Sequence, residues 1–506
     1  VENAKVSGYL DVAVVAGTPY TSKYTNITVQ GHVEVNGFAY VGAVGGKNAY
    51  ADWTNVTVNV DETSYVNANS IEGSTAYRTY VGGVCGFNGE GSHSFTNITS
   101  NIDVKGSTCD VGGLFGIAHY GNKFENCSCS GDVEIYAAEE AEEAQEIGGI
   151  AGVWHNKDDK TVTMTNCTFT GTLKTNIADV DFYYGGLVGK PYSKTGTGIL
   201  WLNGNKCLAN GIIEDENGNL VVNSLDSLEE ALKTAGAAGA GDTTIVFAEN
   251  TNINMTNAAW TPIKVDGYHG ADIVTIEGNG AVITGLKAPL FAGGFAGGSG
   301  IVIKDLTIKD SDIVSANTLG SGAFIESVDS MDKIELTNCH LLDSTVTGGA
   351  GSRTGGLIGW TAGYNNVNDG PVKTYVTIDN CSVIGCTIQC DGSVGGINGH
   401  AGNNAWTYTT IKNCTIQNNT LNSTDDGGWR TGVVVGTANV GEVTISNITE
   451  SGNTLTQTGK TAPEGFKRNY YGRFVPGTTG KLTIDGYKVV AEGKLEDAEG
   501  NTIATN

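Results

Sequence analysis

A box of the form Gly-Gly-hydrophobic-any-Gly recurs five times between residues 82 and 359. The copies are GGVCG at 82–86, GGLFG at 112–116, GGIAG at 148–152, GGLVG at 185–189 and GGLIG at 355–359. Degenerate copies begin at Gly42, Gly293, Gly395 and Gly432. Neighbouring boxes within a run are mostly 30 to 40 residues apart. A fixed period of this length is typical of solenoids, in which one repeat buries its apolar face only against its neighbours.

A second pattern fills the stretches between the boxes: an Asn is followed by apolar residues at every second position. Representative segments are NITVQGHVEV from Asn26, NCSCSGDVEI from Asn126 and NCTIQNNTL from Asn413. Alternation with a period of two predicts β-strands with one buried face. Two short strands around the Asn, a loop, and the box as a third strand then form one repeat. The sequence therefore predicts an all-β solenoid, a parallel β-helix, in which the Asn amides of successive coils stack as a ladder.

The composition and net charge of the chain exclude some classes of binding partner. The 506 residues include 74 Gly and only 7 Pro, and 16% are charged, with a formal net charge of −25. Nucleic acid and anionic membrane surfaces require clustered Lys and Arg, so we expect neither as a partner. No apolar run reaches the length that spans a bilayer, so we expect no membrane insertion of this chain.

The 11 Cys residues allow two interpretations. Six of them follow the repeat Asn or its equivalent, where the side chain is expected to point inward: Cys127, Cys167, Cys207, Cys339, Cys381 and Cys414. Stacked Cys residues on neighbouring coils would be about 4.8 Å apart, which is within the Cα range of a disulfide. Their side chains would run parallel, however, which favours buried free thiols over a disulfide ladder.

The repeats fall into two runs, which predict two β-helix units. We expect residues 1–210 to form the C-terminal part of a first unit, 211–242 a linker and capping helix, 243–490 a second unit, and 491–506 the start of a following linker. The helix is predicted near 224–235, where Leu225, Leu228 and Leu232 have helical spacing. Asp226 or Ser227 can cap its start. We expect the helix to cover the first coil of the second unit.

The end of the first run reappears at the end of the chain. Segment 207–219 (CLANGIIEDENGN) aligns with 489–501 (VVAEGKLEDAEGN) at a constant offset of 282 residues. We therefore expect a tandem array of such units in the parent protein, with this chain acting as a monomer within the array.

The boxes and the Asn-Cys strands resemble the GLUG-motif repeats of large bacterial cell-surface proteins. Segment 243–308, which contains TTIVF, WTPI and VTIEGNGAVITGL, resembles the opening coils of pectate-lyase-like right-handed β-helices in the same kind of protein. The resemblance covers nearly the whole chain. It implies a right-handed parallel β-helix, an extracellular location at the cell surface, and a role in adhesion. It implies no particular chemistry, because a fold does not carry function with it.

An enzyme on this fold would be a polysaccharide lyase or a glycosidase, which needs carboxylates or a base that converge on one groove. Asp305, Asp310 and Asp312 are the best candidate group, although these residues also fit Asn-like turn positions and solvated strand faces. The acidic stretch Glu139–Glu146 predicts a solvated loop, with weak Ca²⁺ binding as an alternative. We therefore expect no catalytic residue, no metal site and no cofactor other than weakly bound Ca²⁺.

Aromatic and histidine side chains follow successive boxes. The candidate ligand-binding residues are Trp154, His155, Tyr192, Trp360, Tyr364, His400 and Trp406. Trp154, Trp360 and Trp406 follow equivalent boxes, so we expect them to emerge at one corner of different coils, where a column of rings can stack on sugar faces. In the alternative interpretation, each ring anchors its own loop against the coil below.

These patterns predict a non-catalytic extracellular adhesin or rigid stalk. Its expected partner is a host or environmental glycan, or a surface protein. Two alternatives stay open: a carbohydrate-active enzyme, which would show two or more carboxylates on adjacent coils of one groove, and a purely structural spacer.

Overall fold

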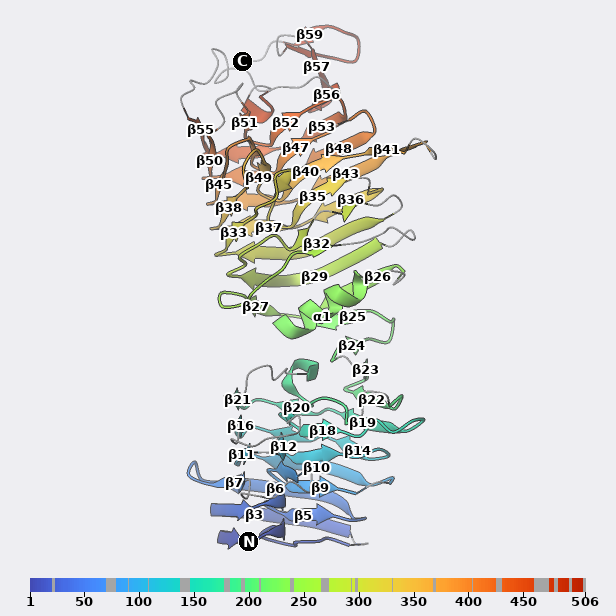
Figure 1. Ribbon diagram of the computed structural model, residues 1–506, viewed down its shortest axis with the longest axis vertical. Helices are drawn as coiled ribbons and strands as arrows, with labels where there is room; N and C mark the ends of the chain where they lie inside the picture. Colours follow the sequence, from blue (N-terminus) through green and yellow to red (C-terminus); the bar gives the residue numbers. More distant parts are fainter. Residues whose placement is uncertain are drawn as a thin grey trace. The chain divides into compact units, whose positions relative to one another are not determined.

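A computed structural model gives the structure of the chain in two units, Val1–Val221 (unit 1) and Val222–Asn506 (unit 2). The described residues are all except 21–22, 70–78, 90, 108, 137–145, 177–182, 193–195, 209–210, 237–240, 265–272, 293, 296–298, 330, 367–369, 403, 425–429, 459–472, 477–480, 491–493 and 504–506. Both units are built mainly of β-strands, and successive repeats within a unit pair in parallel (Figure 1).

Unit 1 places its strands in four parallel sets. The strands that precede or span the repeat Asn are β1 (Glu2–Ser7), β3 (Lys23–Gly37), β6 (Asp52–Val60), β10 (Ser94–Ser100), β14 (Lys123–Glu125), β19 (Thr161–Thr165) and β22 (Ile199–Leu202). Those that follow are β7 (Tyr65–Ala68), β11 (Asp103–Ser107), β15 (Ser128–Cys129), β16 (Val133–Tyr136), β20 (Thr168–Phe169) and β21 (Leu173–Thr175). The residues before each box form β2 (Leu10–Val12), β4 (Ala39–Gly42), β8 (Thr79–Gly82), β12 (Cys109–Gly112) and β17 (Ile147–Gly148). The box ends form β5 (Gly45–Asn48), β9 (Cys85–Asn88), β13 (Phe115–Ala118) and β18 (Ala151–Trp154), and η1 (Tyr183–Gly186) is a short 3-10 helix.

Unit 2 repeats this plan. The strands up to the Asn turn are β26 (Thr243–Phe247), β29 (Ile273–Thr284), β32 (Gly300–Lys309), β36 (Lys333–Thr337), β43 (Thr374–Asp379), β48 (Thr407–Lys412), β53 (Glu442–Ser446) and β56 (Lys481–Ile484). The strands after it are β27 (Asn252–Asn254), β37 (His340–Leu342), β44 (Ser382–Ile384), β49 (Thr415–Gln417) and β54 (Thr449–Ser451), then β33 (Asp312–Val314), β38 (Thr345–Thr347), β45 (Thr387–Cys390), β50 (Thr420–Ser423) and β55 (Thr454–Gln457). Around the boxes lie β34 (Gly320–Ser321), β39 (Arg353–Gly355), β46 (Ser393–Gly395) and β51 (Thr431–Gly432), with β28 (Ile263–Lys264), β30 (Phe291–Ala292), β31 (Gly294–Phe295), β35 (Ile325–Asp329), β40 (Ile358–Ala362), β47 (Asn398–Ala401) and β52 (Val435–Ala438). A hairpin of β41 (Tyr364–Asn366) and β42 (Gly370–Val372) projects from this set.

The core of each unit consists of rows of like side chains, because parallel pairing puts equivalent residues of successive repeats side by side. One inward row of unit 2 contains Ile245, Ile276, Ile303, Leu336, Ile378, Ile411, Ile445 and Ile484, all of them buried. A corresponding row of unit 1 contains Trp53, Phe95, Phe124, Met164 and Leu202. The alternation of the sequence therefore separates a buried and an outward face, as predicted.

The repeat Asn forms the predicted ladder. In unit 1 each side-chain amide donates to the oxygen of the Asn one repeat earlier, from Asn55 to Asn26 at 3.0 Å, from Asn97 to Asn55 at 2.9 Å and from Asn126 to Asn97 at 3.1 Å. These residues have positive φ angles of 54–57°. Asn adopts this left-handed conformation more readily than most residues, so one residue type provides both the turn and the stacked amide.

The Gly boxes are required by close backbone contact. A Cβ added to Gly82 would lie 2.6 Å from the carbonyl oxygen of Leu114 in the next repeat. The hydrophobic box residues Val84, Leu114, Ile150 and Leu357 are buried, and Leu187 is half-buried. The backbone N–H of Val84 bonds Leu114 of the next box at 2.9 Å, and that of Leu357 bonds Ile397 of the next box at 3.0 Å. The period seen in the sequence is therefore the stacking period of the repeats.

The predicted helix is confirmed as α1 (Leu225–Ala235), which packs on β26 through Leu228, Ala231 and Leu232. The expected cap at Asp226 or Ser227 is wrong. Ser224 is the N-cap, and its hydroxyl and that of Ser227 each accept the other residue's backbone N–H, which makes a capping box.

Both units contain the same four-stranded antiparallel meander. It comprises β22, β23 (Asn205–Cys207), β24 (Ile213–Glu214) and β25 (Leu220–Val222) in unit 1, and β56, β57 (Tyr487–Val490), β58 (Lys494–Glu496) and β59 (Thr502–Ile503) in unit 2. The pair Lys206 and Glu214 corresponds to Lys488 and Glu496 in the second copy. The expected linker at 211–242 thus includes strands of unit 1 as well as α1, and the expected linker at 491–506 includes β58 and β59.

The cysteines after the repeat Asn are buried and free. This holds for Cys127, Cys167, Cys207, Cys339, Cys381 and Cys414, which confirms the thiol interpretation over the disulfide ladder. Each side chain occupies an inward position of its strand row, where it packs as a small hydrophobic group.

Candidate functional site

A strip of rings runs across successive repeats of unit 1. We call it the ring strip, and it consists of Tyr40, Tyr80, Phe87, His119, Tyr120, His155 and Tyr192. Three of these residues are held in one row by the backbone. The N–H of His155 bonds the carbonyl of Ala118 at 3.0 Å, and the N–H of Tyr192 bonds that of Trp154 at 2.8 Å. Because β13 and β18 pair in register, His119, His155 and Tyr192 follow one another across the repeats.

The rings of the strip touch in sequence. Centroids of His119 and His155 are 4.4 Å apart, and those of His155 and Tyr192 are 5.0 Å apart. Tyr120 lies beside both imidazoles, at 4.4 Å from His119 and 5.0 Å from His155. His155 is half-buried and Tyr192 is 43% exposed, so the strip reaches solvent at this end.

One cation completes this end of the strip. The Nζ atom of Lys157 lies 4.7 Å from the ring centroid of Tyr120 and donates a hydrogen bond to its hydroxyl oxygen at 3.2 Å. Burial, together with the nearby His155 and Lys157, lowers the pKa of His119 to about 3. His119 is therefore neutral at physiological pH, and its Nε2 atom lies 2.9 Å from Nδ1 of His155, within hydrogen-bond distance.

The other end of the strip is a cluster of phenyl rings. Phe87 lies 5.3 Å from Tyr40 and 5.5 Å from Tyr80, and 6.0 Å from His119. Lys47 lies over the rings of Tyr40 and Phe87, at 5.5 and 5.7 Å. Phe87, Ile117 and Val153 each follow a box by one residue, and together they form an apolar cluster distinct from the core.

Two of the expected ring positions are corrected by the structure. Trp154 is 1% exposed and belongs to the core of unit 1, and Trp360 is 8% exposed in β40. They do not occupy equivalent positions, because Trp360 follows its box by one residue and Trp154 by two. In a strand this difference directs the two indoles to opposite faces. The expectation that both emerge at one exposed corner is wrong.

The remaining expected residues are dispersed. His400 is buried in β47, in register with Trp360, and burial lowers its pKa to about 4. Trp406 is half-buried just before β48, away from the box strands. Tyr364 begins β41, and its side chain lies outside the described residues. Of the predicted set, the structure brings together His155 and Tyr192 in the ring strip, and Trp360 and His400 as buried neighbours on paired strands of unit 2.

Sequence reasoning missed Tyr40 and Tyr80. Each precedes a box by two residues, whereas Phe87 follows a box by one. Positions before and after a box are neighbours in space because the box folds the chain back on itself, as the Cβ positions of the box glycines show. Aromatic residues two positions before a box and one position after a box were therefore the sequence pattern that could have predicted this cluster.

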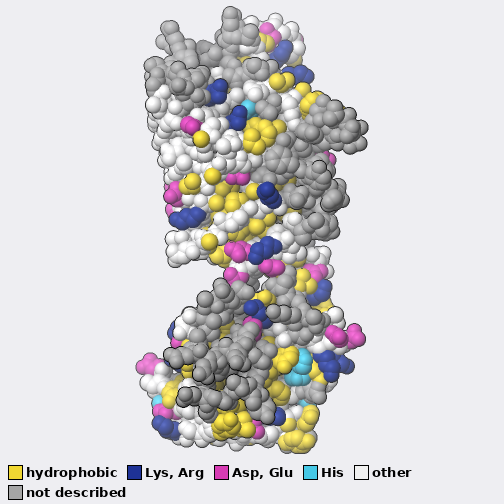
Figure 2. All heavy atoms as spheres, viewed as in Figure 1, with side chains coloured by type: hydrophobic (Ala, Val, Ile, Leu, Met, Phe, Trp, Pro, Cys, Tyr) yellow, Lys and Arg dark blue, Asp and Glu magenta, His cyan; other side chains and the backbone are white. Residues whose placement is uncertain are grey.

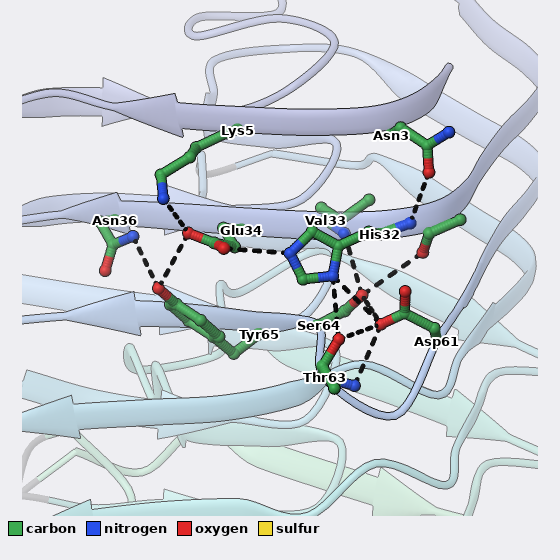
Figure 3. Close-up of polar contacts among 11 residues, drawn as sticks. Asn3, Lys5, His32, Val33, Glu34, Asn36, Asp61, Thr63, Ser64 and Tyr65 are labelled. Carbon is green, nitrogen blue, oxygen red and sulfur yellow. Dashed lines mark hydrogen bonds and ion pairs between the residues drawn. The ribbon is translucent and has the colours of Figure 1, made fainter.

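A polar cluster on the first repeats of unit 1 was also not anticipated (Figure 3). His32 contacts Glu34 through Nε2 at 3.0 Å, and Asp61 and Thr63 through Nδ1 at 3.3 and 2.9 Å. Lys5 pairs with Glu34 at 2.6 Å. The cluster joins β1, β3 and the turn after β6, so it links three successive repeats.

The charges of this cluster support one another. Hydrogen bonds from Lys5 and His32 lower the pKa of Glu34 to about 2, and a hydrogen bond from Thr63 is the largest cause that lowers the pKa of Asp61 to about 2. The hydrogen bonds to Glu34 and Asp61 raise the pKa of His32. The hydroxyls of Thr63 and Ser64 both donate to Asp61, and the Thr63 oxygen also lies 2.9 Å from Nδ1 of His32.

Of the three candidate catalytic acids, Asp305 and Asp310 occupy turn positions, and Asp312 is the exposed first residue of β33. Asp305 has a φ of 53° and accepts the amide of Asn338 at 2.6 Å, so it is the Asn ladder's first acceptor in this part of unit 2. Asp310 has a φ of 49°. Within the described ranges, no group of three or more His, Cys, Asp or Glu side chains is arranged to hold a metal ion. The stretch Glu139–Glu146 lies outside the described residues except for Glu146.

Across the part of the chain that the structure describes, the helices are too short or too polar to cross a bilayer. No protein-family model and no curated protein matches the sequence. A solved structure, the PL6-family alginate lyase AlyGC, aligns over 93% of this chain and 88% of that chain, with 10% sequence identity and a TM-score of 0.21. At that score the alignment establishes no common fold and says nothing about what this chain binds. What the structure itself establishes is a two-unit chain of mostly β-strands, rich in parallel pairing.

Proposed function

We propose that this chain is a non-catalytic extracellular surface protein, an adhesin or rigid stalk, that binds glycan through the ring strip of unit 1. In this proposal each unit is a right-handed parallel β-helix of the GLUG-motif type. The stacked boxes, the Asn ladder and the parallel register of successive repeats support that architecture. The duplicated meander supports a parent protein with several units in tandem, each chain acting as a monomer.

The observation that carries the proposal is the contact series from His119 through His155 to Tyr192. Tyr192, which is 43% exposed, and the half-buried His155 offer ring surface on which the C–H face of a sugar can pack, while the buried His119 supports them from below. Removal of this ring surface from water favours binding. Lys157 and Tyr192 are exposed side chains beside these rings, so their ammonium and hydroxyl groups can bond sugar hydroxyls. A repetitive ligand would gain from several such contacts along one rigid strip.

The charge distribution favours glycan or protein over nucleic acid. The chain has a formal net charge of −25, and acidic and basic side chains are interspersed on the face drawn in Figure 2. A phosphate backbone would be repelled by this net charge. The use of Asp305 as a ladder acceptor supports the non-catalytic proposal over a lyase or glycosidase.

A glycan array with the whole chain tests this function, with a polysaccharide-degradation panel run beside it. We expect glycan binding without cleavage. The Tyr192→Ala, His155→Ala double variant should lose the binding and keep the melting temperature. Tyr487→Ala, which removes an exposed tyrosine of unit 2, is the matched control and should bind normally. Unchanged binding by the folded double variant, or depolymerisation of any polysaccharide, would contradict the proposal.

A further inference from the structure

Unit 2 has a groove on the outward face of the sheet that contains β26, β29, β32 and β36. Its volume is about 340 Å³, and its lining residues are Asp242, Thr244, Ile273, Thr275, Val302, Lys304, Lys333 and Glu335. Binding sites for small molecules begin at roughly 300 Å³. The groove therefore has room for a small ligand, about one or two sugar rings in length.

Two outward rows of the sheet line the groove. Ile273 and Lys333 stand in one row on either side of Gly300, and their side chains already cover the Gly300 position, where an added Cβ would lie 3.2 Å from the Cβ of Lys333. Thr244, Thr275, Val302 and Glu335 form the row beside it. Val302 points outward with the residues of this row, yet it is only 4% exposed, which places it at the floor of the groove. The floor is therefore apolar, with two threonine hydroxyls beside it.

The charged groups of the groove are already paired. Lys304 bonds Glu277 at 2.7 Å, Lys333 bonds Glu335 at 2.9 Å, and a carboxylate oxygen of Asp242 accepts the backbone N–H of Ile273 at 2.9 Å. Three carboxylates thus face two ammonium groups. Such a site holds no surplus positive charge for an anionic ligand, but each group keeps donors or lone pairs that can bond hydroxyls.

An aromatic surface continues the groove. Tyr375 follows Lys333 in the same outward row and is 50% exposed. Its ring stacks on that of Tyr408 in the next repeat, with centroids 5.2 Å apart and an angle of 17° between the planes. The stack fixes the orientation of the Tyr375 ring, which then presents its remaining apolar surface next to the groove.

We propose that this groove is a binding site for a neutral oligosaccharide. One or two sugar rings lie with their C–H faces on Ile273 and Val302, their hydroxyls bond Thr275, Lys304 and Glu335, and the next sugar packs against Tyr375. The combination of an apolar floor, neutralised charges and a stacked ring fits an uncharged polyol with an apolar face better than a uronate or a cation.

This site is separate from the ring strip and does not depend on it. It lies in unit 2, and none of its residues belongs to the strip. Loss of binding at one site therefore leaves binding at the other site measurable. The two proposals are tested by different variants, so one can fail while the other holds.

The test is saturation-transfer NMR and calorimetry on the full chain, with cello-, xylo- and manno-hexaose as neutral probes and a galacturonate hexamer as the anionic probe. We expect at least one neutral probe to bind. Thr275→Tyr, which fills the groove, should weaken it by about tenfold or more, as direct occupation of a ligand's space does. Thr410→Tyr is the matched control, because Thr410 is a half-buried threonine in the same outward row two repeats beyond Glu335.

Further variants separate the outcomes. Tyr375→Ala should weaken a hexaose while leaving a disaccharide unaffected, and the Tyr192→Ala, His155→Ala variant should bind at the groove like wild type. The proposal is overturned if no neutral probe binds, if the galacturonate binds more tightly, or if Thr275→Tyr and Thr410→Tyr behave alike while both keep the wild-type melting temperature.

Discussion

The Nδ1 atom of His155 lies 2.9 Å from the Nε2 atom of His119 in the preceding repeat. The pKa of His119 is lowered to about 3 from its ordinary value of 6.5, chiefly by burial. In the unfolded chain the same imidazole takes up a proton near pH 6.5, so this group makes folding less favourable as the pH falls below that value.

His119→Gln removes this titration and keeps hydrogen-bonding capacity. We expect the gap in unfolding free energy between wild type and variant to shrink as the pH falls from 6.5 towards about 3, because only wild type loses stability through this group. Urea unfolding at several pH values measures the gap. An NMR titration of native protein in which His119 protonates near pH 6.5 would refute the assignment.

The cluster around His32 should stabilise unit 1 within a pH window. Glu34 and Asp61 have pKa values lowered to about 2 from 4.5 and 3.8, so their contribution is complete above pH 4.5 and is lost as the pH falls towards 2. His32 has a pKa raised above 6.5, so its contribution is complete below 6.5 and is lost as the pH rises through the raised value. His32→Gln should therefore remove the alkaline decline in melting temperature and keep the acid decline. Parallel profiles for both proteins would exclude this role.

The buried thiols should resist modification in the native state. Burial raises the pKa of Cys85 to about 12 and that of Cys386 to about 11, so almost no thiolate is present at neutral pH, and the sulfurs are inaccessible. Titration with a thiol reagent should show little reaction in the native protein and full reaction after denaturation without reductant. Thiols that stay unreactive after denaturation would indicate disulfides instead.

Helix α1 should contribute to the stability of unit 2. Leu228→Asp should lower the unfolding free energy by roughly 3 kcal/mol or more, because it removes a buried apolar side chain and buries a carboxylate. Ser224→Ala should cost about 1 kcal/mol through loss of the cap. Lys233→Gln, at an exposed position of the same helix, is the control. Denaturant unfolding followed by tryptophan fluorescence measures these changes, and a Leu228→Asp curve that superimposes on the control would show that the helix adds nothing.

The Asn ladder can be divided into its backbone and amide components. Asn97 has a φ of 56°, donates to Asn55 and accepts from Asn126. Asn97→Gly keeps the left-handed turn and loses the amide, whereas Asn97→Ala loses both, so the Ala variant should be less stable than the Gly variant by about 1 kcal/mol. Thermal unfolding of both variants gives the order. Equal stabilities would mean that the turn conformation costs nothing at this position.

The features that could be predicted from the sequence are local in origin. The alternation of apolar and polar residues, the Gly boxes and the Asn turns each act within a few residues. The strands, the helix and the buried cysteines can therefore be predicted from the sequence. Counting positions after each box also shows that Trp154 and Trp360 are not equivalent, although it does not show that both indoles are buried. The N-cap at Ser224 could be identified only if the first residue of the helix were known to within one position, and helix propensity does not locate a helix end that accurately.

The sites depend on which residues the repeats bring side by side. The groove is lined by residues from two outward rows, Ile273 and Lys333 in one and Thr275, Val302 and Glu335 in the other, and only the register of the strands shows which residues share a row. The ring strip requires that Tyr40 and Phe87 meet across a folded box. Because the repeats differ in length, the sequence does not show which residues align across repeats, and the register of the strands is needed to find them.

The amide ladder also has an electrical consequence. In unit 1 Asn55, Asn97, Asn126 and Asn166 each donate towards the N-terminal repeats, and in unit 2 Asp305, which accepts as a carboxylate, begins the row in the same sense. Backbone hydrogen bonds between strands alternate in direction and largely cancel, whereas aligned side-chain amides add head to tail. Each unit therefore has a dipole along its stacking direction, positive towards its first repeats, and a repeat inserted with the opposite polarity would face two donors or two acceptors.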